Sequence, residues 1–397
     1  MKILVVGGTG ILSTAVVERC IERGDSVTMI NRGNRPNQIH PKATLIKCDI
    51  RDKNQLDNIS KDLGEFDVVI DFLVFNASEL NVSLQYFAKN TKQYVFISSA
   101  QVYNTSIGGL LTEDSPKPQK LWSYSVNKLE CEKYLISYCK NNKINYTIIR
   151  PAVNYDGTRI PYGIFPPMGY HWTLVERIKH EKPIITWNHG QNRLNLTRVE
   201  DFAEATVGLM GNPKAYNEDF NVAGDNVYSW MDVLFVLGDL LGKKVVTFDL
   251  PVDYYYKELP KHQKEELVGG RANDMICSIN KLKTLLPDFR PRYDLREGVK
   301  KTLDYYEKNN YLNGIDYVLD GDCDRIIKKY CRIKRIATPP NCDYIDYFNG
   351  GKDYDKNSYY SPYYKDRISY RVKHKLITLI GGVLPKGVKK ILLSIIK

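Results

Sequence analysis

The first thirteen residues constrain the fold of this chain more than any other segment. An apolar run, Lys2-Ile-Leu-Val-Val6, ends in the turn Gly7-Gly-Thr-Gly10 and leads into a segment of helical period. In such a turn Gly7 permits the tight bend, and Gly10 lets the backbone approach a pyrophosphate at the helix N-terminus. The third small position holds Ser13, where glycine is usual. The pattern predicts a nucleotide-binding turn, and the alternative is a plain strand-to-helix turn.

Strand-like and helix-like segments alternate from residue 1 to about residue 150. The strand-like runs are short and rich in Val, Ile and aromatic residues, at 3–6, 26–30, 44–47, 68–72, 94–98 and 146–149. Such alternation predicts an α/β fold with a doubly wound parallel sheet of Rossmann type, which binds its ligand beyond the carboxyl ends of the strands. We therefore expect residues 1–150 to form an NAD(P)-binding domain.

The rest of the chain divides into two further regions. Helical patterns at 174–181, 199–210, 230–241 and 294–308 predict a smaller substrate-binding region, 151–330, partly interwoven with the first domain. Residues 331–397 form a Tyr-rich and basic extension, in which eight Lys and Arg residues but no acidic residue follow Asp366. Those eight account for most of the net charge of +11, so a nucleic-acid groove over the whole protein is not expected.

The end of the chain carries an interrupted amphipathic pattern. Pro385 separates an apolar run, 376–384, from residues 388–397, where lysines alternate with Ile and Leu at helical spacing. Neither piece reaches the ~20 residues that span a bilayer. The pattern predicts peripheral contact of residues 376–397 with an anionic membrane surface, or packing on the body or on a second subunit.

Cysteine and histidine residues indicate no metal site. The eight cysteines are scattered without a CxxC pair, and the six histidines show no ligand spacing. Scattered cysteines are typical of reduced, buried thiols, and the N-terminus is a strand pattern rather than a signal peptide. We therefore expect a cytoplasmic protein, with contact at the inner face of the membrane as the open alternative.

The segment Tyr124-Ser-Val-Asn-Lys128 carries the predicted chemistry. A Tyr and a Lys four residues apart lie on one face of a helix. An ammonium beside a phenol lowers the pKa of the phenol, which suits acid–base catalysis near neutral pH. Ser99, at the end of a strand-like run, is placed to hydrogen-bond the same substrate oxygen. Together with the glycine turn, these three residues predict hydride transfer on an alcohol or a ketone.

The predicted cofactor site draws on the glycine turn, on the ends of the second and third strands and on the helix that carries Tyr124. Its residues are Gly7, Thr9, Gly10, Ile11, Leu12, Asn31, Arg32, Asp49, Ile50 and Lys128. NAD enzymes usually carry a carboxylate after the second strand, whereas Arg32 suits a 2′-phosphate, so NADP is favoured over NAD. Stacking of Arg32 on adenine remains the alternative. Asp49 either meets the adenine edge or caps a helix.

The motifs together resemble those of the extended short-chain dehydrogenase/reductase superfamily, in its NAD(P)-dependent nucleotide-sugar epimerase/dehydratase branch. The resemblance runs to about residue 329 and rests on Gly7-Gly-Thr-Gly10, Asn31-Arg-Gly33, Cys48-Asp-Ile-Arg-Asp52, Ser98-Ser-Ala-Gln-Val-Tyr103, Trp122-Ser-Tyr-Ser-Val-Asn-Lys128 and Arg150-Pro151. It implies that Tyr124 and Lys128 are catalytic, that Ser99 assists, and that the substrate is a nucleotide sugar, in bacteria often one used for surface polysaccharide. A homodimer is compatible with the resemblance.

One departure from the family pattern bears on the reaction. Dehydratases of this superfamily usually carry an Asp-Glu pair directly after the catalytic Ser or Thr, and this chain has Ala100-Gln101 there. Without a carboxylic acid to protonate the leaving hydroxyl, 4,6-dehydration is disfavoured, and epimerisation or keto reduction is favoured. The alternative is a catalytically inactive NAD(P)-binding or RNA-binding member of the same fold, which would have no reason to keep Ser99, Tyr124 and Lys128 together.

Overall fold

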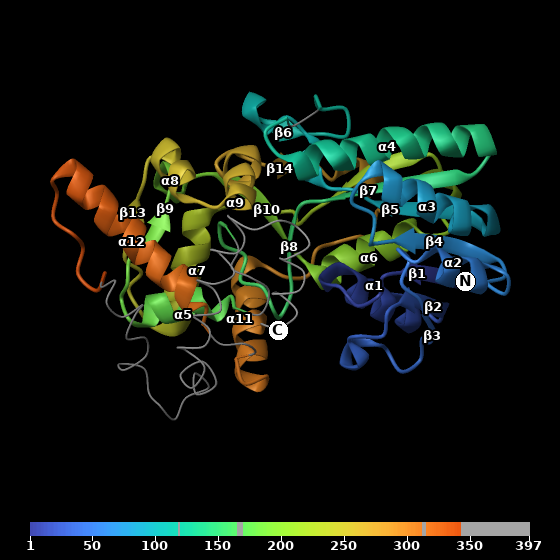
Figure 1. Ribbon diagram of the computed structural model, residues 1–397, viewed down its shortest axis with the longest axis horizontal. Helices are drawn as coiled ribbons and strands as arrows, with labels where there is room; N and C mark the ends of the chain where they lie inside the picture. The colour runs from blue at the N-terminus through green and yellow to red at the C-terminus, as the bar shows by residue number, and fades with distance from the viewer. Residues whose placement is uncertain (118–119, 165–169, 312–314, 343–397) are drawn as a thin grey trace, which may run out of the picture. The chain divides into compact units, whose positions relative to one another are not determined.

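Seven parallel strands form the central sheet of the computed structural model (Figure 1), in the order β11-β7-β5-β4-β1-β2-β3. Their bounds are β1 Lys2–Val6, β2 Ser26–Asn31, β3 Thr44–Lys47, β4 Phe66–Asp71, β5 Thr91–Ile97, β7 Asn145–Pro151 and β11 Glu218–Val222. The strand order reverses between β1 and β4, so the predicted doubly wound parallel sheet is confirmed. The structure describes residues 1–342 except 118–119, 165–169 and 312–314.

The sheet register brings the functional segments to one edge. Val6 is the partner of Ile30 on one side and of Asp71 on the other. Ile97 of β5 is likewise the partner of Ile149 of β7. The carboxyl ends of these strands are therefore level, and the segments that follow them leave the sheet at the edge where such folds bind ligands.

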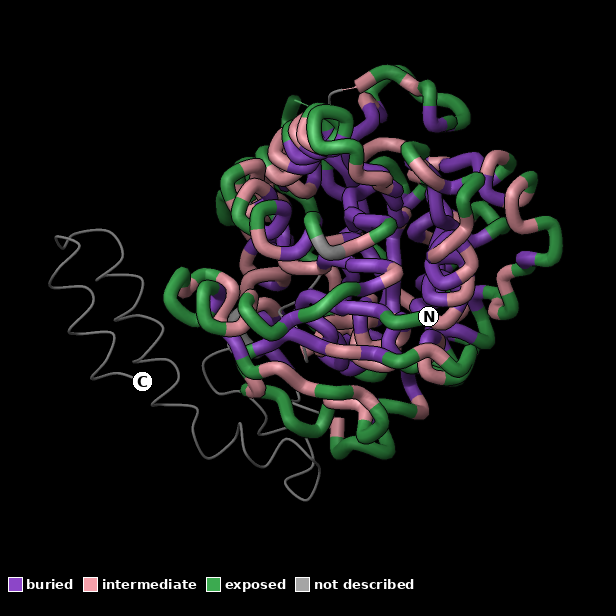
Figure 2. Tube along the Cα trace, turned by 90° about the vertical axis from the view of Figure 1, so that its right-hand side faces the viewer, coloured by how far each residue is buried: buried purple, intermediate pink, exposed green. Residues whose placement is uncertain are grey.

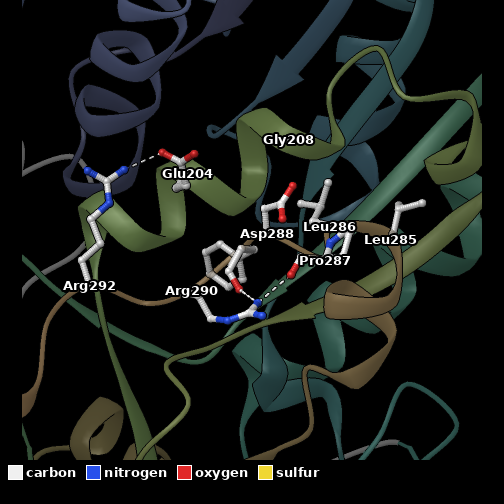
Figure 3. A pocket seen from close by; sticks show the side chains of 9 residues that line it. Glu204, Gly208, Leu285, Leu286, Pro287, Asp288, Arg290 and Arg292 are labelled. Carbon is white, nitrogen blue, oxygen red and sulfur yellow. Dashed lines mark hydrogen bonds and ion pairs between the residues drawn. The ribbon is translucent and has the colours of Figure 1, made fainter.

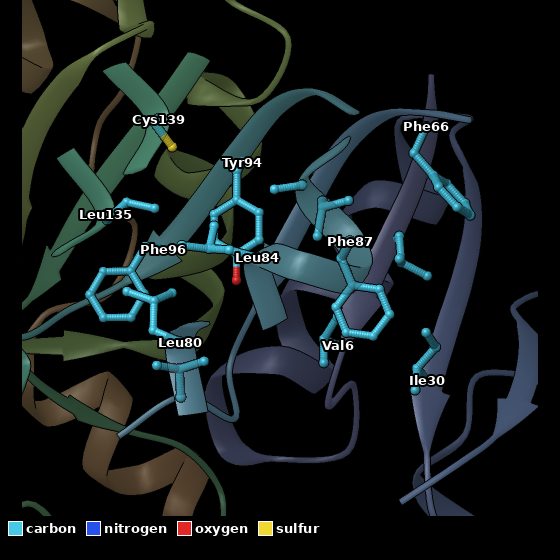
Figure 4. Close-up of a cluster of buried hydrophobic side chains, with 14 of the residues drawn as sticks. Val6, Ile30, Phe66, Leu80, Leu84, Phe87, Tyr94, Phe96, Leu135 and Cys139 are labelled. Atoms are coloured by element: carbon cyan, nitrogen blue, oxygen red, sulfur yellow. The ribbon is translucent and has the colours of Figure 1, made fainter. Parts of the chain in front are cut away.

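Helices cover both faces of the sheet, because the apolar side chains of its central strands point to both faces. Strand β1 is buried on both faces, which is typical of the centre of a parallel sheet. Helices α1 (Ile11–Glu22) and α6 (Val199–Leu209) pack together, as do α2 (Lys53–Ser60), α3 (Ala77–Phe87) and α4 (Ser123–Asn142) (Figure 1). Side chains from α3 and α4 meet those of the strands in one apolar cluster (Figure 4), and buried residues follow the central strands (Figure 2).

The remaining elements follow in chain order. The strands are β6 (Leu110–Leu111), β8 (Val153–Tyr155), β9 (Ile184–Thr186), β10 (Arg193–Arg198), β12 (Val227–Ser229), β13 (Thr247–Asp249) and β14 (Ile276–Cys277). The helices are α5 (Trp172–Lys179), α7 (Trp230–Leu241), α8 (Val252–Glu258), α9 (Lys261–Glu266), α10 (Asn280–Leu285), α11 (Leu295–Lys308) and α12 (Tyr317–Lys334). Within the described residues, no helix is long and apolar enough to cross a membrane.

The backbone divides into two compact units. The first comprises residues 1–165, 186–242 and 249–304, and contains the central sheet and every residue of the predicted site. The second comprises residues 166–185, 243–248 and those from 305 onward. The predicted domain bounds, 1–150, 151–330 and 331–397, remain a prediction, and the amphipathic segment 376–397 lies outside the described residues.

A buried ion pair joins helix α4 to the ends of the strands. Glu132 of α4 accepts hydrogen bonds from Nε and Nη2 of Arg150 at 2.9 and 2.8 Å, and from Oγ of Ser98 at 2.5 Å. Arg150 also pairs with Asp219 of β11 at 2.6 Å and donates to the Tyr103 hydroxyl at 2.9 Å. Because a buried charge is tolerated only when it is paired, this network fixes where α4 lies on the sheet.

Replacing Arg150 with Met should destabilise the protein by about 3–5 kcal/mol, because it leaves the buried carboxylate of Glu132 without its partner. The matched control is Arg51→Met, which removes the exposed pair with Glu79 and should cost no more than about 1 kcal/mol. Urea unfolding of both variants checks the difference. Equal losses would show that the Arg150 network contributes no more than a surface ion pair.

Candidate functional site

Ser13 fastens the glycine turn that opens the fold. Gly7 adopts a φ of +97°, and a Cβ atom there would lie 2.5 Å from Cγ of Leu73, so the position requires glycine. Helix α1 begins after Gly10, whose N–H donates to Oγ of Ser13 at 2.7 Å. The same Oγ donates to the carbonyl of Gly7 at 3.0 Å. The departure from glycine at position 13 therefore closes the turn with hydrogen bonds and leaves its shape intact.

The end of β2 presents an unsatisfied amide beside this turn. Asn31 is buried, and its Oδ1 accepts the N–H of Gly33 at 2.8 Å, while its Nδ2 has no partner among the described residues. Buried polar groups are nearly always hydrogen-bonded, so this donor suits a ligand oxygen. Arg32 is exposed at the same strand end, and Arg35 donates from Nη1 to the carbonyl of Thr9 at 3.2 Å.

Asp49 and Ile50 lie half-buried after β3. The helix that follows is capped by Asp52, whose Oδ1 accepts the N–H of Asn54 at 3.0 Å. The alternative that Asp49 is the helix cap is therefore wrong. The Asp49 carboxylate accepts one backbone N–H, from Arg51 at 3.1 Å. The glycine turn, the unpaired Nδ2 of Asn31 and the Asp49 carboxylate together fit the adenosine end of a dinucleotide.

Helix α4 carries the predicted catalytic residues on one face. Tyr124, Lys128 and Glu132 follow one another at intervals of four residues. Lys128 is only 3% exposed, and its Nζ donates to the carbonyls of Val74 at 2.7 Å and Ile97 at 2.8 Å. Val74 belongs to the segment that follows β4, and Ile97 is the last residue of β5, so Lys128 joins α4 to the edge of the sheet where the site lies.

Burial governs the protonation of Lys128. Its ammonium lies 4.8 Å from the ring centroid of Phe75 and 5.0 Å from that of Phe96. These rings attract the cation, but they also exclude water from it. Burial lowers the pKa of Lys128 to about 8, although the nearby carboxylate of Asp71 opposes the shift.

The prediction that Lys128 lowers the pKa of Tyr124 is wrong for the protein alone. Burial raises the pKa of Tyr124, and the hydrogen bond with Ser99 opposes that rise only in part. Nζ of Lys128 is turned to two carbonyls and lies 6.0 Å from the centroid of the Tyr124 ring. The structure nevertheless places Ser99 and Lys128 near Tyr124, and the predicted contact of Ser99 with a substrate oxygen remains a prediction.

Asp71 is a site residue that the sequence reasoning missed. This buried carboxylate at the end of β4 accepts the N–H of Leu73 at 2.7 Å, the hydroxyl of Tyr94 at 3.1 Å, and a hydrogen bond from Ser83. It thereby shapes the segment in which Leu73 packs on Gly7 and Val74 holds Lys128. An acidic residue ending an apolar strand was the available signal, since such a charge needs buried partners.

Trp122 forms a wall beside Tyr124. The two rings are tilted with their centroids 5.3 Å apart. A short π-helical turn, Leu267–Arg271, packs on the other side, where a Cβ atom on Gly269 would lie 2.6 Å from Cβ of Trp122. Trp122 therefore has packing contacts with both Tyr124 and Gly269.

Other features of the molecule lie apart from these residues. A cavity of about 310 Å³ opens between α6 and residues 285–292 (Figure 3), and none of the predicted site residues lines it. The part of the chain that the structure describes contains no group of three or more His, Cys, Asp or Glu side chains placed to hold a metal ion. The candidate site is thus the edge of the sheet that carries the glycine turn, Ser99 and α4.

Several known proteins are similar to this chain. The model of the NAD dependent epimerase/dehydratase family matches residues 3–223. The chloroplast stem-loop binding protein of 41 kDa b of Arabidopsis thaliana is 28% identical over 352 residues, which are 83% of this chain and 84% of that protein. The UDP-glucose 4-epimerase of Vibrio cholerae is 26% identical over 243 residues, 60% of this chain and 70% of the relative.

Solved structures share the fold. The UDP-glucuronic acid 4-epimerase of Bacillus cereus, in complex with UDP-glucuronic acid and NAD, superposes with a TM-score of 0.59. It is 21% identical in sequence, and the match covers 78% of this chain and 99% of that one.

The pKa of Lys128 predicts how stability depends on pH. Between pH 8 and 10.5 the unfolded chain binds the Lys128 proton more fully than the folded protein does, so stability should rise with pH across this window. The free energy of unfolding of wild type minus that of Lys128→Met should become more positive by about 3 kcal/mol from pH 8 to pH 10.5. Urea unfolding of both proteins at intervals of pH measures it, and a flat difference would contradict the assignment.

Proposed function

The chain belongs to the NAD dependent epimerase/dehydratase family, and within it we propose an NAD(P)-dependent epimerase or keto-reductase of a nucleotide sugar. The observation that carries the proposal is the convergence of Ser99, Tyr124 and Lys128 at the edge of the sheet that also holds the glycine turn. The substrate class is supported by the UDP-glucose 4-epimerase relative and by the fold shared with the UDP-glucuronic acid 4-epimerase.

Tyr124 is the group that exchanges a proton with the substrate. NAD(P), when bound, supplies the hydride acceptor and donor. Since burial raises the pKa of Tyr124, the phenol is protonated at neutral pH in the protein alone and serves as a proton donor to a keto oxygen. Ser99, which lies beside that phenol, would orient the same oxygen. In the reverse direction the deprotonated form of Tyr124, the phenolate that remains after this donation, takes the proton of the hydroxyl group.

Lys128 holds the cofactor side of the site. An ammonium has three N–H donors, and the structure gives Nζ two hydrogen bonds, to Val74 and Ile97. The third donor would bond the nicotinamide ribose. Asn31 and the glycine turn would hold the other end, where the orphaned Nδ2 of Asn31 suits a ribose hydroxyl.

Dehydration is not part of the proposal. Ala100 and Gln101 occupy the two positions after Ser99, so neither side chain there can protonate a leaving hydroxyl. Epimerisation would first oxidise a hydroxyl group to a ketone and then return the hydride to the other face. Keto reduction comprises only the second half, with a hydride taken from NAD(P)H and a proton taken from Tyr124.

An RNA-binding role is the second candidate, because the stem-loop binding relative matches most of this chain. The intact arrangement of Ser99, Tyr124 and Lys128 supports the enzyme instead. Purified protein assayed with a panel of nucleotide sugars and NAD(P)(H), and in parallel for binding to an RNA stem-loop, separates the two candidates. RNA binding without turnover of any sugar would favour the second.

Replacing Tyr124 with Phe should lower turnover by about 10²- to 10⁴-fold, because it removes the proton donor and little volume. Cofactor affinity should stay nearly unchanged. Tyr138→Phe, on the same helix, is the matched control and should retain wild-type turnover. Steady-state kinetics with product analysis measures both, and near-normal turnover in a folded Tyr124→Phe protein would overturn the mechanism.

We also propose that Arg32 selects NADP through its 2′-phosphate. A charge-assisted hydrogen bond of this kind contributes about 1.5–3 kcal/mol, so Arg32→Ala should weaken NADP binding and leave NAD binding unchanged. Arg35→Ala should weaken both cofactors alike, because Arg35 contacts the glycine turn itself through the carbonyl of Thr9. Fluorescence titration of the three proteins with both cofactors checks this, and equal affinities in wild type would reject the role of Arg32.

A further inference from the structure

Gln101 has a buried carboxamide oxygen with no partner. The residue lies in the short helical turn Ala100–Val102 that begins directly after Ser99, and its backbone N–H donates to Oγ of Ser99 at 3.2 Å. Its side chain is 6% exposed, yet Oε1 accepts no hydrogen bond within the described residues. A buried acceptor left unsatisfied destabilises a protein, so the position calls for a donor from outside the chain.

A second buried glutamine in the same sheet shows the contrast. Gln93 of β5 is 0% exposed, and its side chain is fully used. Its Nε2 donates to Oγ1 of Thr147 at 2.8 Å and to the carbonyl of Leu209 at 3.2 Å, and its Oε1 accepts the N–H of Gly211 at 2.7 Å. The side chain of Gln93 therefore holds segments of the fold together. The carboxamide oxygen of Gln101 makes no hydrogen bond to the described residues.

The Gln101 side chain lies beside Gly270 and Trp122, close to Tyr124. A Cβ atom on Gly270 would lie 2.9 Å from Oε1 of Gln101 and 3.2 Å from Cζ3 of Trp122. The Trp122 ring in turn packs on Tyr124, with 5.3 Å between ring centroids. The carboxamide thus lies against the same aromatic wall as the phenol, and the glycine at position 270 leaves it room.

We propose that Gln101 binds the sugar of the substrate, by accepting a hydrogen bond from a hydroxyl group with Oε1. A hydroxyl both donates and accepts, so it satisfies either end of a carboxamide. The inference rests on the proposed function and deepens it, because it assigns a residue that selects hydroxylated sugars and orients them relative to Tyr124. Because the carboxamide of Gln101 is neutral and cannot give up a proton, it can hold a hydroxyl group without acting as an acid on it.

Gln101→Met tests the assignment, since methionine keeps the volume of glutamine and removes its polar atoms. The variant should bind UDP-glucose about tenfold more weakly than wild type in the presence of saturating NAD, which is the effect of one lost hydrogen bond. Binding of UDP, which lacks the sugar, should be unchanged. Isothermal titration calorimetry with both ligands measures this, and KM should rise more than kcat falls.

The matched control is Gln93→Met. It removes three hydrogen bonds inside the protein and should lower the melting temperature, with UDP-glucose affinity unchanged. Gln101→Met loses no side-chain hydrogen bond to Oε1 and should melt no lower than wild type. A stability loss in Gln101→Met with unchanged UDP-glucose affinity would show a purely structural role and overturn the proposal.

Gly270→Ala provides an independent route to the same contact. The added methyl group would displace the Gln101 carboxamide, so this variant should also weaken UDP-glucose binding. In the Gln101→Met background the additional effect of Gly270→Ala should shrink, which a double-mutant cycle measures. Fully additive effects would contradict a shared contact.

The two proposals fail in different ways. If wild-type protein binds and converts no nucleotide sugar of the panel that includes UDP-glucose and UDP-glucuronic acid, the proposed function is wrong, and the role of Gln101 with it. If wild type binds a sugar of the panel and Gln101→Met binds it equally well, only the role of Gln101 is overturned.

Discussion

The buried pair of Glu132 and Arg150 is the interaction on which the site depends. It ties helix α4 to the carboxyl ends of β5 and β7 through Ser98 and Arg150, and Arg150 pairs in turn with Asp219 near the start of β11. Lys128 lies one turn before Glu132 on the same face, so its ammonium is delivered to the carbonyls of Val74 and Ile97. Tyr124 lies a further turn away and reaches Ser99. The ion pair therefore fixes the position of α4 on the sheet, and with it the positions of Lys128 and Tyr124.

Much of this arrangement could be predicted from local patterns. The glycine turn, the strand-like runs and the spacing of Tyr124 and Lys128 are contained within segments of a few residues, and the sheet follows from their alternation. The meeting of Ser99 with Tyr124 could be predicted too, because the end of a parallel strand and the start of the following helix lie at the same edge. These features depend on chain-local geometry, which the sequence displays directly.

The features that could not be predicted depend on contacts between residues that are distant along the chain. Gly270 packs on Gln101 and Gly269 on Trp122 across more than a hundred positions, so neither the orphaned oxygen nor the aromatic wall appears in any local pattern. The prediction of a lowered pKa for Tyr124 is wrong for a related reason. Charge spacing suggested a neighbouring ammonium, but the burial created by the assembled fold is the larger effect. Domain bounds and the roles of single residues remain predictions.

Some buried polar groups in this protein complete the fold, and others keep an atom without a partner in the chain. Ser13, Asp71 and Gln93 each have every expected partner within the chain, and each fastens a turn or a strand. Asn31 and Gln101 are buried too, yet each keeps one amide atom without a partner among the described residues. An unsatisfied buried group costs stability, and Asn154 keeps such an amide atom as well, so the missing partner does not by itself mark a site. For Asn31 and Gln101 the position adds the second argument, because one lies beside the glycine turn and the other directly follows Ser99, and we propose that a ligand completes both.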